Sequence, residues 1–245
     1  TAAFIQGNEP CARILYKENF ESLLLRRLAR DSGHSLPLRA AAAVEASKTL
    51  RYELNICRRF DKVIMISDED RQRFEAYHPP ASLEVLSPGV DLDYYQPGRQ
   101  DHNEPGIIFT GSMDYFPNAD AIQFFCREIW PKIRAQVPAA HFNIVGQRPE
   151  SAVKEWDGKD GITVTGRVED IRPHIGRASV YVVPLRVGGG VRLKILEALA
   201  MGKAVVSTPV GAEGIDLEAG KQILLAKDAG TFADQVISLL RSPEQ

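Results

Sequence analysis

The second half of the chain alternates short apolar runs with amphipathic segments, and this alternation restricts the possible folds more than any other feature. Between most successive runs lies a segment whose apolar residues recur with helical spacing, as over residues 117–137. The last such segment covers residues 228–242. Strand-length apolar runs occur at 106–112, 140–146, 161–168, 179–185, 203–209 and 222–226. Strand–helix alternation with continuously apolar strands predicts an α/β fold with a parallel sheet flanked by helices.

The first part of the chain carries a shorter version of this pattern. Apolar residues recur with helical spacing over residues 20–32 and 38–59, which predicts two helices. The apolar run at 61–67 is typical of a strand buried on both faces. Ser67 is then expected to cap a helix, because acidic residues follow it directly. We therefore expect a partial Rossmann-like lobe over residues 1–97.

A polar stretch rich in Gly, Pro, Asp and Asn separates the two patterns. This composition is typical of a linker, which we place at residues 98–105. The remainder, residues 106–245, is then a complete or nearly complete Rossmann-like domain. The expected architecture is α/β with two Rossmann-like lobes.

Composition excludes several classes of function. The net charge of −2 over 245 residues gives no general attraction for nucleic acid. The three cysteines are scattered, and no His/Cys cluster has metal-ligand spacing, so we predict no metal site. No apolar run approaches the roughly 18 residues that span a bilayer, and the N-terminus lacks a signal-peptide layout. We expect a cytoplasmic protein.

The loop before the predicted helix near residue 195 has the composition of an anion site. Three glycines, Gly188, Gly189 and Gly190, precede Val191, so that backbone N–H groups can approach a ligand closely. The N-terminus of the following helix adds donors and partial positive charge, which suits phosphate. The alternative to an anion site is an ordinary glycine-rich turn between a strand and a helix.

Two cations follow the glycines, where the helix dipole disfavours positive charge. We expect Arg192 and Lys194 in the first helical turn, and a bound diphosphate would compensate for this placement. Glu197 comes three residues after Lys194 among apolar neighbours, and its carboxylate could accept hydrogen bonds from a ribose diol. Alternatively, Glu197 pairs with Lys194 or faces solvent.

The segment from 184 to 215, which contains GGGVRLKILEA, resembles the donor-binding signature of family-four glycosyltransferases of the GT-B fold. Glu197 matches the second acid of their E-x7-E motif, whereas Gly189 stands at the first. A subgroup with GGG-x-RLKILEA matches closely. This resemblance implies a retaining transfer of a hexose from a nucleotide-diphosphate sugar, such as a UDP- or GDP-sugar, to a hydroxyl acceptor in polysaccharide or glycolipid synthesis. It implies no further cofactor and no metal.

The same resemblance assigns further donor-binding residues. The segment FTGSMDYFPNADAIQFF resembles the loop that usually supplies an Arg and a Lys to the diphosphate, and it places Gly111 there, with Ser112 and Asn118 at the positions of those cations. Arg192 and Lys194 are then the expected catalytic replacements. The backbone around Arg167 and Val168 would face the nucleobase.

Two assignments stay open at the level of sequence. Asn19 and Glu21 follow a predicted strand end, so they either face an acceptor or serve as the cap and first turn of a helix. The basic runs RRLAR and CRRF indicate a solvated helix face, with peripheral membrane contact as the second interpretation.

The resemblance also implies that this chain is shorter than a full enzyme of the family. A full enzyme of this kind has roughly another hundred residues of N-terminal domain before Thr1. A fragment or a shortened relative is therefore expected. The alternative function is a non-catalytic nucleotide-sugar-binding module or partner subunit, and a nucleotide-sugar epimerase of similar fold ranks below both.

Overall fold

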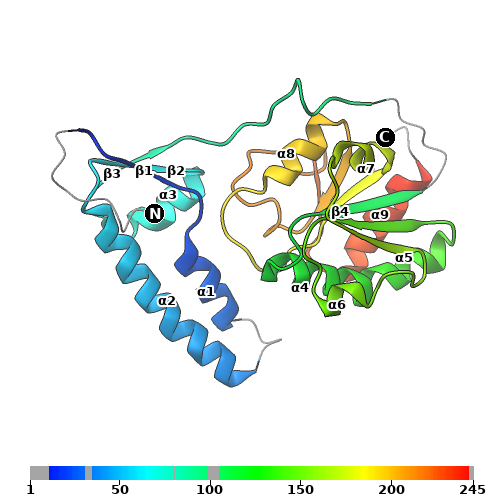
Figure 1. Cartoon of the computed structure of the whole chain (residues 1–245), viewed down its shortest axis with the longest axis horizontal. Coiled ribbons are helices and arrows are strands. Elements are labelled where there is room, and N and C mark those ends of the chain that lie inside the picture. The colour runs from blue at the N-terminus through cyan, green and yellow to red at the C-terminus, as the bar shows by residue number, and fades with distance from the viewer. Residues whose placement is uncertain (1–10, 31–34, 80, 99–104, 243–245) are drawn as a thin grey trace. The chain divides into compact units, whose positions relative to one another are not determined.

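The computed structural model describes residues 11–30, 35–79, 81–98 and 105–242 (Figure 1). The chain divides into two compact units. Unit 1 contains residues 1–88 together with Val187–Val191 and Glu213–Ile215, and unit 2 contains the remainder. Both are α/β units built on parallel strands, so the predicted fold class is confirmed.

Unit 1 has a three-stranded parallel sheet in the order β1-β2-β3. Ile14 pairs with Lys62, and Lys62 pairs with Ser82. The strands are β1 (Ile14–Lys17), β2 (Lys62–Met65) and β3 (Ser82–Val85), and the helices are α1 (Glu21–Arg30), α2 (Leu36–Cys57) and α3 (Asp68–Glu75). The sequence had predicted these elements to within a few residues.

The core of unit 1 lies where the helices pack on the sheet. Its buried residues are Phe20, Ile56, Cys57, Phe60, Val63, Met65 and Phe74. Phe20 and Phe74 make an edge-to-face contact with ring centroids 5.4 Å apart, an arrangement that the ring quadrupoles favour. Ser67 caps α3 by accepting a hydrogen bond from the Asp70 backbone N–H at 3.1 Å, which confirms the predicted cap.

Unit 2 has a six-stranded parallel sheet in the order β6-β5-β4-β7-β8-β9. Its strands are β4 (Gly106–Thr110), β5 (His141–Val145), β6 (Ile162–Gly166), β7 (Val180–Val183), β8 (Ala204–Ser207) and β9 (Leu224–Leu225). All four residues of β7 are buried, as expected for a central strand with both faces covered. The chain runs outward from β4 to β6 and then returns to the other side of β4, so the strand order reverses between β4 and β7.

Helices connect these strands. They are α4 (Phe116–Phe124), the π-helical turn η2 (Phe125–Ile129), α5 (Trp130–Gln136), α6 (Ser151–Lys154), α7 (Arg172–Arg177), α8 (Leu193–Ala200) and α9 (Ala229–Arg241). The segment predicted as one helix over 117–137 is thus interrupted by a π turn. Pro131 lacks a backbone N–H and cannot continue the regular ladder, which accounts for the irregularity just before it.

The predicted domain limits can be compared with the two units. Residues 89–98 belong to unit 2, whereas the prediction assigned residues up to 97 to the first lobe. Of the predicted linker at 98–105, residues 99–104 lie outside the described part of the chain. In addition, two short segments from the second half of the sequence belong to unit 1.

Candidate functional site

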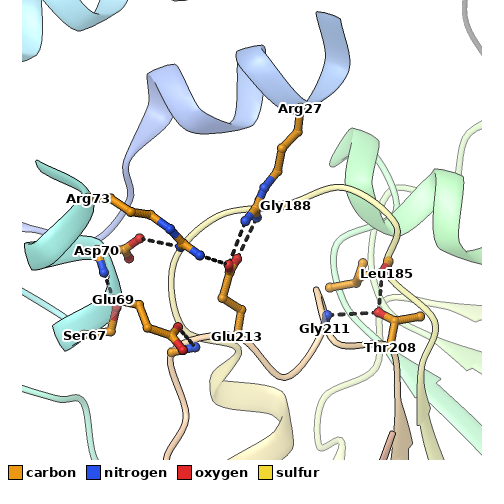
Figure 2. Close-up of polar contacts among 11 residues, drawn as sticks. Arg27, Ser67, Glu69, Asp70, Arg73, Leu185, Gly188, Thr208, Gly211 and Glu213 are labelled. Carbon is orange, nitrogen blue, oxygen red and sulfur yellow. Dashed lines mark hydrogen bonds and ion pairs between the residues drawn. The ribbon is translucent and has the colours of Figure 1, made fainter. Parts of the chain in front are cut away.

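The reversal of strand order between β4 and β7 marks the expected ligand position in unit 2. In open parallel sheets, ligands bind beyond the carboxyl ends of the strands at such a reversal. Strand β4 ends at Thr110 and is followed by Gly111, and β7 leads to the loop before α8. Nearby, Thr208 ties the loops after β7 and β8 together, because its hydroxyl donates to the Leu185 carbonyl and accepts from the Gly211 N–H (Figure 2).

Lys194 of α8 reaches the end of β4. Its Nζ donates to the Thr110 carbonyl oxygen at 2.6 Å and to Asn118 Oδ1 at 3.0 Å. It also lies 4.3 Å from the centroid of the Phe109 ring, which adds a cation–π contact. The ammonium group is therefore held at the predicted ligand position by two neutral acceptors and one aromatic face.

The environment of Lys194 disfavours its charged form. Burial is the main cause, and the neighbouring charge of Arg192 acts in the same direction, while Glu197 opposes them. Together they lower the pKa of Lys194 to about 7. The residue as a whole is half-buried.

Asn118 and Gly111 complete the surroundings of this ammonium group. The Asn118 side-chain amide donates to the Ser112 carbonyl at 2.8 Å while its oxygen accepts from Lys194. A Cβ on Gly111 would lie 2.7 Å from Asn118 Nδ2 and 3.0 Å from Lys194 Nζ, so only glycine permits this close approach. The Ser112 hydroxyl donates to Asp114 Oδ1 at 2.5 Å.

Arg192 and Glu197 lie before and within α8. Arg192 occupies the N-cap position and the helix begins at Leu193, so Arg192 precedes the first turn in which the sequence had placed it. Glu197 accepts a hydrogen bond from the Tyr95 hydroxyl. Burial, followed by the charge and hydrogen bond of Glu197, raises the pKa of Tyr95 to about 12.

The sequence analysis did not single out Tyr95. The segment GVDLDYYQP resembles the interdomain linker pattern N-G-V-D-x-x-x-F-x-P of the same family, and Tyr95 stands at the position of its Phe. Tyr181, fully buried in β7, shares a hydrogen bond with Thr110 Oγ1, and its pKa is raised mainly by burial. Unit 2 thus holds Lys194, Thr110, Tyr181, Glu197 and Tyr95 in one region of linked polar contacts.

The predicted nucleobase residues follow the end of β6. Arg167 is exposed and Val168 is half-buried directly after Gly166. Strand β6 is at one edge of the sheet, two strands from β4. Their predicted contact with the base stays a prediction.

The glycine loop belongs to unit 1. The Gly188 carbonyl accepts a hydrogen bond from Arg27, and a Cβ on Gly190 would lie 2.3 Å from Asn19 Oδ1. Gly190 also has a φ of +74°, which favours glycine. That the amides of Gly188, Gly189, Gly190 and Val191 bind the donor stays a prediction.

Unit 1 contains a cluster of ionic contacts around Glu213. Figure 2 shows the side chains of Arg27 and Arg73 pointing toward its carboxylate. Arg27 binds it through both terminal nitrogens, at 2.6 and 2.7 Å, and Arg73 pairs with the same group. Burial raises the pKa of Glu213, but the hydrogen bonds and charges of Arg27 and Arg73 outweigh it, so the pKa is lowered overall.

Asn19 and Glu21 had two possible roles, acceptor contact and helix capping, and both stay predictions. Glu21 is the first residue of α1 and is exposed, whereas Asn19 lies two positions before the helix and contacts the glycine loop. The N-terminus of α1 is instead bound by buried Glu53 of α2. Its carboxylate accepts from the Glu21 N–H at 3.0 Å and from the Ser22 hydroxyl at 2.6 Å.

The sequence analysis missed Glu53, although its position offered a signal. Glu53 comes three residues after Leu50 and four before Cys57, a spacing that places it on the apolar face of α2. Lys17 Nζ lies 2.5 Å from Glu53 Oε1, which pairs the buried carboxylate with a cation. An acid with this spacing indicates a paired structural carboxylate.

Unit 2 also has an open cavity of about 570 Å³ away from Lys194. It lies between residues 93–98 and α7. Its lining residues are Asp93, Tyr94, Gln96, Pro97, Gly98, Asp170, Arg172, Pro173, Gly176, Arg177 and Met201. No predicted donor-binding residue lines it, so we place the candidate site by hydrogen-bond geometry at the strand ends.

Among the described residues, no three or more His, Cys, Asp or Glu side chains gather where they could hold a metal ion. Within the same part of the chain, no helix combines the length and the apolar composition that crossing a membrane requires.

Several curated proteins resemble this chain in sequence. A GDP-mannose-dependent alpha-(1-6)-phosphatidylinositol monomannoside mannosyltransferase of Mycobacterium tuberculosis is 28% identical over 206 residues, which cover 74% of this chain and 52% of that protein. An uncharacterized 44.6 kDa protein in the cps region of Klebsiella pneumoniae is 24% identical over 188 residues, which cover 73% of this chain and 47% of that protein. The chain thus spans about half the length of the curated relatives it matches.

Solved structures agree on the fold. TarM superposes with a TM-score of 0.75 at 12% identity, covering 99% of this chain and 46% of TarM. Anabaena HepE in complex with UDP and glucose superposes with a TM-score of 0.70 at 14% identity, covering 94% of this chain and 62% of HepE. The family described as "Glycosyl transferases group 1" matches residues 104–242, which is more than half of the chain. The chain therefore belongs to the group 1 glycosyl transferases, which confirms the resemblance seen in the sequence.

Proposed function

We propose that this chain binds a nucleotide-diphosphate sugar in unit 2 and transfers its hexose to a hydroxyl acceptor, with retention of configuration. The observation that carries the proposal is the Lys194 ammonium, held by the Thr110 carbonyl and Asn118 at the end of β4. Because those acceptors are neutral, the charge on Lys194 is available to an anionic ligand. A diphosphate is the anion that this sheet position suits.

The expected chemistry is stabilisation of a leaving group. Negative charge builds on the diphosphate as the bond to the sugar breaks, and cations already in place stabilise it without reorganising. Lys194 and Arg192 are the catalytic residues in this scheme. By analogy with oxyanion donors, each good contact contributes a few kcal/mol, about 3 in favourable cases.

Glu197 would hold the ribose and so position the donor. Its carboxylate already accepts from the Tyr95 hydroxyl and retains further lone pairs for a diol. Gly111 and Ser112 would contact the diphosphate, and the backbone at Arg167 and Val168 would face the base. Orientation of this kind lowers the barrier by fixing the reacting groups before the chemical step.

The names of relatives support the choice of substrates. The mycobacterial relative uses GDP-mannose and a phosphatidylinositol mannoside, and the Klebsiella relative comes from a cps region. A D-inositol 3-phosphate glycosyltransferase of Mycolicibacterium paratuberculosis is 25% identical over 197 residues, covering 74% of this chain and 44% of that protein. We therefore place the acceptor among glycans and lipid-linked hydroxyl compounds, with Asn19 and Glu21 as candidate acceptor-side residues.

The place of action follows from that acceptor. We propose a cytoplasmic protein that works at the inner face of the membrane through peripheral contact. Flotation with vesicles containing an anionic phospholipid checks this point, because a chain without surface contact stays at the bottom of the gradient.

Calorimetry with UDP, GDP and their glucose and mannose conjugates tests donor binding. We expect one nucleotide to bind with a dissociation constant in the micromolar range and to raise the melting temperature. If no nucleotide binds or raises the melting temperature, the proposal is wrong.

A second candidate function is a non-catalytic donor-binding module or partner subunit. The chain corresponds to about half the length of the curated relatives it matches. An assay of sugar transfer or donor hydrolysis separates the two functions. Tight binding without turnover supports the module, and turnover supports the transferase.

A further inference from the structure

We propose that Asn118 is the positioning residue of the donor site, because its side-chain oxygen holds the Lys194 ammonium where the donor diphosphate binds. This inference rests on the proposed function and deepens it. Asn118 itself touches no reacting atom in the scheme. It acts through Lys194, which the previous section makes the catalytic cation.

The first step of the argument concerns the geometry around Lys194 Nζ. An ammonium group has three hydrogens, and two of them point to the Thr110 carbonyl and to Asn118 Oδ1. In the part of the chain that the structure describes, these are the hydrogen-bond acceptors of Lys194. The two bonds leave one hydrogen of the ammonium without a hydrogen-bond acceptor among the described residues, and in our proposal an oxygen of the ligand accepts it.

The second step concerns what fixes Asn118. It lies in the first turn of α4, where its backbone N–H donates to the Tyr115 carbonyl at 2.9 Å. Its side-chain amide donates to the Ser112 carbonyl at 2.8 Å, so the orientation of the amide is determined by both of its ends. Asn118 is buried, and a Cβ at position 111 would lie 2.7 Å from its Nδ2, so the glycine there leaves the amide the space it occupies.

The third step concerns charge. The charged groups that act on Lys194 are Arg192 and Glu197, while its neighbours from β4 and α4, namely Thr110, Phe109 and Asn118, are neutral. An aspartate at position 118 would have nearly the same shape and would neutralise the ammonium. Asparagine therefore positions the cation without removing the charge that the diphosphate needs.

This role predicts a coupling that a purely structural residue does not show. In the full chain, we expect Asn118→Ala to weaken UDP or GDP binding about tenfold, whichever of the two the wild type binds. In a Lys194→Met background, the same change should alter affinity less than twofold, because the cation to be positioned is gone. Asn143→Ala, a half-buried asparagine of β5 in the same unit, serves as the matched control and should leave affinity unchanged.

The shape-matched variant Asn118→Asp gives a second readout. It should weaken nucleotide binding more than Asn118→Ala does and should move the pH midpoint of the Lys194 side chain upward. Lysine Cε NMR follows that titration without any ligand, and Lys194→Met identifies the resonance. Thermal melting shows that each variant is folded, and Asn118→Asp covers the case in which Asn118→Ala does not fold.

The outcomes separate this inference from the proposed function. If the wild type binds nucleotide but Asn118→Ala weakens binding equally with and without Lys194, Asn118 has only a structural role and the inference is wrong. An unchanged Lys194 midpoint in Asn118→Asp also overturns it. If the wild type binds neither UDP nor GDP, the proposed function and the donor-positioning role fall together, and the NMR shift then reports only the local contact.

Discussion

Arg27 in unit 1 and Lys194 in unit 2 are both partly buried cations, yet their partners differ in kind. Arg27 meets the carboxylate of Glu213 through two hydrogen bonds, and Arg73 shares the same group (Figure 2). Lys194 meets only a backbone carbonyl and an amide oxygen as hydrogen-bond acceptors among the described residues. Arg27 therefore has a carboxylate as its hydrogen-bond partner, whereas Lys194 has only neutral acceptors.

This difference separates a cation with a structural partner from the cation that we propose binds the ligand. An arginine bound to a carboxylate contributes to folding and has little attraction left for an anionic ligand. Lys194 loses solvation on burial and lies near the like charge of Arg192, which the charge of Glu197 only partly offsets, so its pKa falls to about 7. A diphosphate would supply the missing counter-charge.

The largest expected effect follows from removing the cation that has only neutral acceptors. Lys194→Met should weaken binding of the nucleotide that the wild type prefers by about 100-fold, since a charge-assisted contact to phosphate is lost. Calorimetry measures the change, and Lys132→Met, which removes an exposed lysine of α5, is the control expected to stay within twofold. Equal affinities for Lys194→Met and the wild type would remove the distinction between the two cations.

The next effect in size concerns the cation with a carboxylate partner. Glu213→Gln leaves Arg27 and Arg73 without a counter-charge, so we expect the free energy of unfolding to fall by about 2 kcal/mol. Urea titration measures it. Glu75→Gln, which alters an exposed pair with Arg71, should change stability by less than about 0.5 kcal/mol. Similar losses in the two variants would contradict the structural role of Glu213.

These two environments also mark what the sequence could predict. The strands of unit 2 and the Ser67 cap follow from local patterns, namely apolar runs and a serine followed by acids. The contact between Arg27 and Glu213 joins residues 186 positions apart, and no local pattern carries that information. A charged residue in a sequence indicates a candidate, but only the fold decides whether a carboxylate or a carbonyl meets it.

Asn118 illustrates the same limit within the candidate site. The resemblance located it in the diphosphate loop but described it as the loss of a cation. The structure adds that its amide holds Lys194, which comes from a helix 76 positions later. Conversely, Lys194 and Arg192 could be proposed from the sequence because charge at a helix start conflicts with the dipole.

A further effect concerns pH and uses the sign of the Lys194 shift. Because its pKa is lowered in the folded state, the folded protein binds fewer protons than the unfolded chain above about pH 7. The cost of burying the lysine is fully present below pH 7 and decreases as the pH rises toward its usual value near 10.5. The stability of the wild type relative to Lys194→Met should therefore rise between pH 7 and 10.

Melting temperatures of the two proteins across this range provide the measurement, because other titrating groups are common to both and cancel. A difference that stays constant with pH would show that Lys194 keeps an ordinary pKa. Arg192 and Glu197 are the charged groups acting on it, so Glu197→Gln should shift the midpoint further downward.

The smallest expected effect tests the anion of the site, Glu197, in the same terms. Its bond to the Tyr95 hydroxyl is with a neutral donor. Tyr95→Phe removes only the hydroxyl, and we expect a two- to fivefold loss of affinity for the preferred nucleotide, since one neutral donor to a carboxylate contributes about 0.5–1 kcal/mol here. The loss should be smaller for the corresponding 2′,3′-dideoxynucleotide, because that ligand lacks the diol that Glu197 is proposed to bind. Equal losses of affinity for the two nucleotides would show that Tyr95 takes no part in ribose recognition. Tyr52→Phe removes the hydroxyl of an exposed tyrosine of α2 and serves as the control, which should leave the affinity unchanged.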